Sequence, residues 1–202
     1  MNNLIVKISN GNTKMGTIKS VSLPPVATCR KNAPCIKNCY ARRLQRFPNV
    51  KNAYENNLQL YKENPALYFD GITNAAYTER FFRWHVSGDI PDITYFRYMC
   101  GVALVCENTS FLCFTKKYEI VNEYIKQGCT IPKNLIIIFS VWNSLDLVNP
   151  YDMATAHVVP KETAGIWGNN ECNGNCLYCA ENNLRCWSFA AGGSDKVFLI
   201  EH

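Results

Sequence analysis

The sequence contains no apolar run approaching the roughly 20 residues that span a bilayer. Its longest such run, from Leu135 to Phe139, is far too short. The first residues, MNNLIVKISN, lack the basic segment and long apolar stretch of a secretory signal peptide. Internal repeats and low-complexity tracts are also absent. We therefore expect a cytoplasmic protein with no membrane partner.

No strong excess of one charge marks the chain either. The formal net charge is +5, and 48% of the 202 residues are hydrophobic, as is typical of a globular protein and not of a disordered or fibrous one. This length suffices for one substantial core with a small appendage. A mild positive charge permits an anionic partner, such as a nucleotide or a nucleic acid, but a solvated basic surface is the commoner meaning.

Complete disulfide pairing is excluded, because the chain has eleven cysteines. In a reducing compartment thiols stay free unless a metal takes them. Scattered cysteines behave as small buried hydrophobic residues. Seven of these, however, lie in two short segments, and that grouping indicates metal binding.

Between residue 17 and residue 162, short apolar runs alternate with helical patterns. This alternation predicts an α/β fold with parallel strands and crossover helices, forming either a partial (β/α) barrel or an open, mostly parallel sheet. About five such units are present, too few for a complete eight-stranded barrel. The predicted strands are 18–26, 81–86, 111–115, 135–141, 155–159 and 196–200, and the predicted helices cover residues 54–61, 66–78, 95–102 and 118–125.

The composition changes at Thr163, after which Gly, Asn and Cys dominate up to Cys186. We therefore divide the chain into an α/β core, residues 1–162, and a small C-terminal cysteine-rich metal-binding appendage with the final strand, residues 163–202. Gly192-Gly193-Ser194 is expected to form the turn before that strand.

The front cysteine cluster has the spacing C-x5-C-x3-C and comprises Cys29, Cys35 and Cys39. Three thiolates on one loop can hold three corners of a 4Fe–4S cluster and leave one iron open. Nearby Arg30, Lys31 and Lys37, together with a helix N-terminus, are expected to lower the thiol pKa values. Zinc is the alternative. It would need a fourth ligand, taken from a histidine or from Cys100, Cys106, Cys113 or Cys129.

The rear cysteine cluster comprises Cys172, Cys176, Cys179 and Cys186. Four ligands within fifteen positions make a closed site with no metal position left for a substrate. The spacing suits a second 4Fe–4S cluster, and zinc is the alternative here as well. The surrounding Gly and Asn residues allow the tight turns that such a loop needs.

Polar side chains stand where the predicted strands end, the edge at which α/β proteins bind ligands. They predict a shared pocket for a small-molecule ligand. For His85, within an apolar strand, a hydrogen-bonded core position is the alternative, and Asp89 would cap a helix beginning at Ile90-Pro91. The pocket candidates are His85, Lys116, Asn143 and His157.

The segments SLPPVATC (22–29) and Cys35-x3-Cys39-Tyr40-Ala41 resemble the phage gene-product-88-like family. The His85–Asp89 strand end and the terminal cysteines are similar too, so the resemblance covers most of the chain. It implies a phage or prophage origin, and hence the cytoplasm of the host cell, but no assigned activity.

A broader resemblance is to radical S-adenosylmethionine (SAM) enzymes, which bind a cluster through three cysteines after their first barrel strand. A motif ending their second strand contacts SAM. The front cluster and Ser87-Gly88-Asp89 occupy these places, although the family spacing is C-x3-C-x2-C. The resemblance implies that Ser87, Gly88 and Asp89 bind SAM.

Three functions follow. The first is a small radical-SAM-like iron–sulfur enzyme with an open front cluster and a closed rear cluster. The second is a non-enzymatic electron carrier or redox sensor, which exchanges electrons with a protein partner. The third is a zinc-stabilised nucleic-acid-binding module, suggested by the net charge and by Arg42, Arg43 and Arg46.

Overall fold

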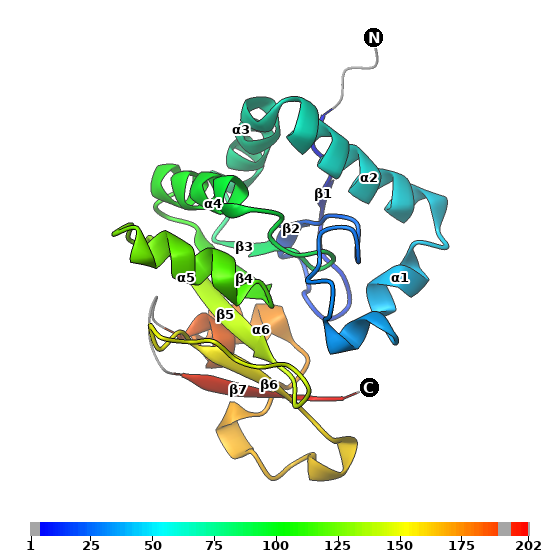
Figure 1. Ribbon diagram of the computed structural model, residues 1–202, viewed down its shortest axis with the longest axis vertical. Helices are drawn as coiled ribbons and strands as arrows, with labels where there is room; N and C mark the ends of the chain where they lie inside the picture. Colours follow the sequence, from blue (N-terminus) through cyan, green and yellow to red (C-terminus); the bar gives the residue numbers. More distant parts are fainter. Residues whose placement is uncertain (1–4, 190–194, 202) are drawn as a thin grey trace.

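The computed structural model describes residues 5–189 and 195–201, and its strands form one seven-stranded sheet (Figure 1). The strands lie in the order in which they occur along the chain. Six of them, from β2 to β7, are parallel, and β1 pairs with β2 antiparallel. The strands are β1 (Ile8–Ser9), β2 (Lys19–Val21), β3 (Phe81–Trp84), β4 (Ser110–Thr115), β5 (Leu135–Val141), β6 (Thr155–Val159) and β7 (Lys196–Ile200).

The sheet is open and mostly parallel, one of the two forms expected from the sequence. The connections between β2 and β5 cross one face of the sheet, as in a (β/α) barrel, whereas the connection from β6 to β7 crosses the opposite face. A doubly wound sheet instead reverses direction and places helices on both faces.

One face of the sheet is covered by four long helices (Figure 1). Alternate strand residues such as Phe82, Trp84 and Phe111 point toward these helices and form the larger core. Asn64 caps α3 and Asp92 caps α4, each accepting a hydrogen bond from a backbone N–H in the first turn. The helices are α2 (Pro48–Glu63), α3 (Pro65–Ala76), α4 (Ile93–Val105) and α5 (Tyr118–Lys126), and the shorter α1 (Tyr40–Leu44) precedes them.

The opposite face is covered by the cysteine-rich part of the chain. Helix α6 (Cys176–Glu181) and the turn Arg185–Trp187 pack on Leu112, Ile136 and Ile138 of the central strands. Trp187 is buried there and its ring meets that of Phe81 edge-on, with 5.3 Å between ring centroids. The cysteine-rich segment therefore buries the apolar face of the sheet that lies opposite the long helices.

Two local predictions are wrong. The first strand extends only over Lys19–Val21, because beyond it the chain turns to pack on the end of β3, where the Leu23 N–H donates to the Ser87 carbonyl at 3.0 Å. Asp89 caps no helix, since α4 begins at Ile93 with Asp92 as its cap. The Gly192-Gly193-Ser194 turn lies outside the described residues.

Candidate metal centres

The front cysteines lie on the loop that follows β2, and this loop is fixed to the segment after β3. Thr28 makes the central link: its hydroxyl donates to the Pro24 carbonyl at 3.0 Å and accepts from the Asp89 N–H at 3.1 Å. Ser87 donates from its hydroxyl to the Leu23 carbonyl at 3.0 Å. The loop thus has a fixed base just before its first cysteine.

Asp89 is the buried anchor of this arrangement. Its carboxylate accepts hydrogen bonds from the Thr115 hydroxyl (2.6 Å), the Ile90 N–H (2.8 Å) and the Lys116 N–H (2.9 Å). Burial raises the pKa of this carboxyl, while the hydrogen bonds act in the opposite direction. The described contacts of Ser87 and Asp89 are thus with the protein's own groups, and their predicted contact with SAM stays a prediction.

The three front thiols lie within electrostatic reach of one another. Burial raises the pKa of Cys29 to about 11, and Asp89, Cys35 and Cys39 raise it further, against a lowering by a backbone hydrogen bond from Val26. The expected lowering by nearby cations is therefore wrong at Cys29, where burial dominates. Arg30 is also turned away, donating to the Lys116 carbonyl at 3.3 Å and to the Asn32 side chain at 3.0 Å.

The remaining cysteines are placed away from this loop. Cys113 points into the core under the helices, where its sulfur lies 3.8 Å from Nδ1 of His85. The other three belong to the same core on the helix side. Cys100, Cys106, Cys113 and Cys129, considered as a fourth ligand of the front site, thus lie in the core under the helices and not on the front loop.

The rear cysteines are held by partners far away in the sequence. The Cys172 N–H donates to the Phe198 carbonyl of β7 at 2.9 Å, and the Cys176 N–H donates to the Lys14 carbonyl at 2.8 Å. Next to Lys14, Gly16 lies so close to α6 that an added Cβ would stand 2.8 Å from the Leu177 side chain. The β1–β2 connection and β7 thus hold the backbone of the rear cysteine cluster in place.

The four rear thiols also influence one another. Burial raises the pKa of Cys186 to about 12; Cys172, Cys176 and Cys179 raise it further, and Arg83 lowers it. Cys179 is only 5% exposed, and its sulfur accepts a hydrogen bond from the Arg185 guanidinium at 3.6 Å. Thiols that raise one another's pKa become stable as a group of thiolates only when a cation joins them.

The described residues form no preformed coordination shell. Within residues 5–189 and 195–201, no three His, Cys, Asp or Glu side chains are arranged to hold a metal ion. The donor types nevertheless suit zinc or iron–sulfur, because thiolates are the ligands of both. Binding would require the thiols of each segment to turn toward a common point.

The predicted strand-end pocket does not assemble. His85 is buried with φ of 52°, its Nε2 lies 3.0 Å from the Tyr95 hydroxyl, and burial and Arg83 lower its pKa to about 3. It is the hydrogen-bonded core histidine considered as the alternative. His157 lies on β6, three strands away from β3 and about 14 Å by strand spacing, and lines a separate hollow of about 370 Å³ with Thr155 and Lys196.

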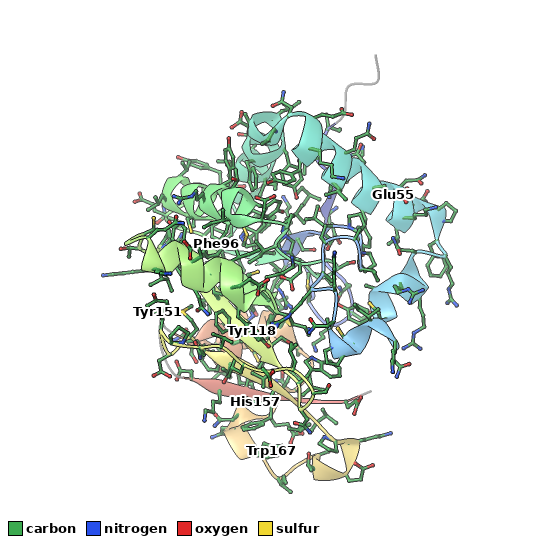
Figure 2. The ribbon with its side chains drawn as sticks, in the orientation of Figure 1. Glu55, Phe96, Tyr118, Tyr151, His157 and Trp167 are labelled. Carbon is green, nitrogen blue, oxygen red and sulfur yellow. The ribbon has the colours of Figure 1, made fainter. Side chains whose placement is uncertain are left out.

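Figure 2 shows His157 near Trp167 at the β6–β7 end of the molecule, and Phe96 and Tyr118 in the helical layer. Lys116 lies over the Trp142 ring, 5.7 Å from its centroid, and Asn143 is exposed on the following turn. The four candidates therefore line no common site.

Sequence reasoning missed the cations around the rear thiols. Arg83, Lys14 and Arg185 come from β3, the β1–β2 connection and the last turn of the cysteine-rich segment. The signal was an arginine in the middle of an otherwise apolar strand, Phe81-Phe82-Arg83-Trp84.

The family model described as Gene product 88 matches residues 2–191. The chain belongs to the Gene product 88 family. No curated protein and no solved structure matches it, so the resemblance to radical SAM enzymes gains no support. Among the described residues, no helix is long and apolar enough to cross a membrane.

Proposed function

We propose that this Gene product 88 family member is a metal–thiolate protein with two centres, filled by iron–sulfur clusters. Cys29, Cys35 and Cys39 would hold the front cluster, and the four rear cysteines the other, in the cysteine-rich segment. The observation that carries the proposal is the packing of the four rear cysteines in one cluster, with Arg185 donating to the Cys179 sulfur and Lys14 next to Cys176. Bound iron–sulfur clusters would supply one-electron redox chemistry.

The surroundings of the rear thiols favour metal binding over simple packing. A buried cysteine that only fills space needs no positive charge nearby, and an uncompensated cation near an apolar face is unfavourable. Here Lys14 and Arg83 both lower the pKa of Cys176, against the larger effect of burial. Cations placed there stabilise thiolates, which are the metal-binding form.

The experiment is metal analysis of the full chain after strictly anaerobic purification. We expect iron, acid-labile sulfide and broad visible absorption. The double substitution Cys35→Ser/Cys39→Ser should remove the iron bound at the front cluster. The double substitution Cys176→Ser/Cys179→Ser should remove the iron bound at the rear cluster. Cys129→Ser is the matched control, because Cys129 is half-buried outside both clusters, and it should lose none.

The outcomes separate the alternatives. Stoichiometric zinc without sulfide, in a colourless protein, would replace iron–sulfur by zinc and favour a nucleic-acid-binding module. Salt-dependent affinity for DNA or RNA would then be the next measurement. A folded protein holding neither metal, or equal losses in Cys129→Ser and in the paired variants, would overturn the proposal.

An enzymatic role is a second candidate, favoured by the three-cysteine front site. It stands at the carboxyl edge of a parallel sheet, where α/β proteins place their ligands. Three thiolates leave one position of a cluster free for a small molecule such as SAM. SAM binding to the loaded protein, and 5′-deoxyadenosine formed under reductant, would support this reading. A reversible redox couple without SAM binding would support an electron carrier or redox sensor.

A further inference from the structure

Arg83 lies on the cysteine-covered face of the sheet. Its neighbours on β3, Phe82 and Trp84, belong to the core under the helices, so the alternation of a strand directs Arg83 to the opposite face. There its guanidinium lies over the Phe114 ring, 4.5 Å from the centroid. The side chain is therefore held against the layer that contains α6 and the rear cysteines.

The charge of Arg83 has no anionic partner in the described part of the chain. The ion pairs found there are Lys19–Glu79 and Lys51–Glu55. The Nε atom of Arg83 is buried and has no hydrogen-bond partner among the same residues. A buried cationic donor of this kind is unfavourable unless an anion accompanies it. The stacking on Phe114 gives the guanidinium a cation–π contact, but it provides no hydrogen-bond acceptor for the Nε–H group.

The rear thiols are groups on this face that could supply that anion. Phe114, over whose ring Arg83 lies, packs together with Cys172, Cys176 and Cys186 against the core of this face. Lys14 is held beside them by the hydrogen bond from the Cys176 N–H to its carbonyl, and Arg185 donates directly to the Cys179 sulfur. Cations from three separate parts of the chain thus converge on one group of cysteines.

We propose that Arg83 is the counter-ion of the rear metal–thiolate centre, an inference that rests on the proposed function. Four thiolates around zinc leave a net double negative charge, and an iron–sulfur cluster with four thiolates is also anionic. Arg83 supplies a fixed positive charge and a free Nε–H donor beside these sulfurs. It is a positioning residue that favours the thiolate form and, in an iron–sulfur centre, the more negative reduced state.

The test uses the full chain carrying Cys35→Ser/Cys39→Ser, so that the rear centre is observed alone. In this background Arg83→Gln removes the charge, Arg83→Lys keeps it, and Arg80→Gln is the matched control. Arg80 lies just before the same strand, is exposed, and stacks on Phe81 at 5.1 Å. It therefore loses the same charge without acting on the thiols.

We expect Arg83→Gln to weaken metal binding about tenfold in competition with a chelator, the lower end of the effect of removing a supporting contact. Arg83→Lys should lose less, and Arg80→Gln should match the parent. For an iron–sulfur centre, the reduction potential should fall, because loss of the positive charge disfavours the more negative reduced cluster more than the oxidised one. The metal-free Arg83→Gln protein should be at least as stable as its parent, because an uncompensated cation is removed.

Equal affinity and potential in Arg83→Gln and Arg80→Gln would overturn the inference while leaving the proposed function intact. A metal-free Arg83→Gln protein much less stable than its parent, with unchanged metal affinity when folded, would assign Arg83 a structural role instead. Failure of the proposed function itself is distinguishable, because the parent protein would then hold no metal.

Discussion

His85 illustrates how a residue that invites a catalytic interpretation serves the core. It directly follows β3, with its backbone in the left-handed region and its ring between Tyr95 and Cys113. Burial, reinforced by the charge of Arg83, lowers its pKa to about 3 from an ordinary 6.5. The folded protein therefore keeps this imidazole neutral throughout the range in which an exposed histidine becomes protonated.

This shift predicts a pH dependence of stability. The unfolded chain takes up a proton at His85 below pH 6.5 while the folded chain does not. The stability that depends on its neutral form is therefore complete above pH 6.5 and is lost as the pH falls toward 3. The slope from this one group is about 1.4 kcal/mol per pH unit.

Urea unfolding at several pH values between 7.5 and 4.5 (roughly one pKa unit above and two below the ordinary value) measures this slope. His85→Asn is the comparison, because asparagine tolerates a positive φ and retains a hydrogen-bonding side chain. The variant should have a visibly smaller slope. Identical slopes in the two proteins would show that His85 does not titrate on unfolding.

At the scale of elements, the connection between the front loop and the end of β3 depends on Gly88. Its φ is 78°, and an added Cβ would stand 2.7 Å from the Thr28 hydroxyl and 2.8 Å from the Leu23 carbonyl. Only glycine meets both the backbone conformation and the close approach at little cost. The loop that carries the front cysteines thus packs against Gly88 so closely that no side chain fits at this position.

We expect Gly88→Ala to destabilise the protein by about 1–3 kcal/mol, the cost of a strained backbone with a steric clash. Gly101→Ala is the matched control, because Gly101 lies in α4 with nothing within 4 Å of an added Cβ. That change should stabilise by about 0.5–1 kcal/mol. Thermal unfolding of both variants tests this, and a neutral Gly88→Ala would show that the two segments are not in contact.

Elements were predictable where the chain carries a short run of β-branched and apolar residues. The strands 135–141, 155–159 and 196–200 are confirmed to the residue, because such runs favour extended backbone in a buried or half-buried sheet. The first strand was predicted too long. Its apolar continuation around Pro24 and Pro25 is buried by the segment after β3 and not by strand pairing.

For the molecule as a whole, the cysteine-rich segment serves as the second cover of the sheet. It packs on Leu112, Ile136 and Ile138, which the helices leave uncovered. Metal binding and burial of this face are therefore linked, because a metal that orders the segment also keeps the central strands covered. A metal that binds only the folded state also increases the stability of the protein.

Removal of the metal should consequently loosen one side of the molecule only. In amide hydrogen exchange, chelation should increase exchange over residues 172–187, while the α3 and α4 amides keep their protection, because the helices pack on the other face. Cys176→Ser/Cys179→Ser should mimic the chelated protein. A uniform rise in exchange along the chain, or no change in 172–187, would contradict this one-sided link.

The sequence alone determined the α/β class, most strands and helices and the two cysteine groups, because these depend on periodicity and spacing within short segments. Only the tertiary structure decided that all four long helices lie on one face and that the cysteine-rich segment covers the other. It also decided that Arg83 lies on the face that the rear cysteines cover and that Lys14 lies beside Cys176. Such charges come from strands and turns distant in the chain, and their meeting depends on strand order and side-chain alternation, which no local pattern encodes.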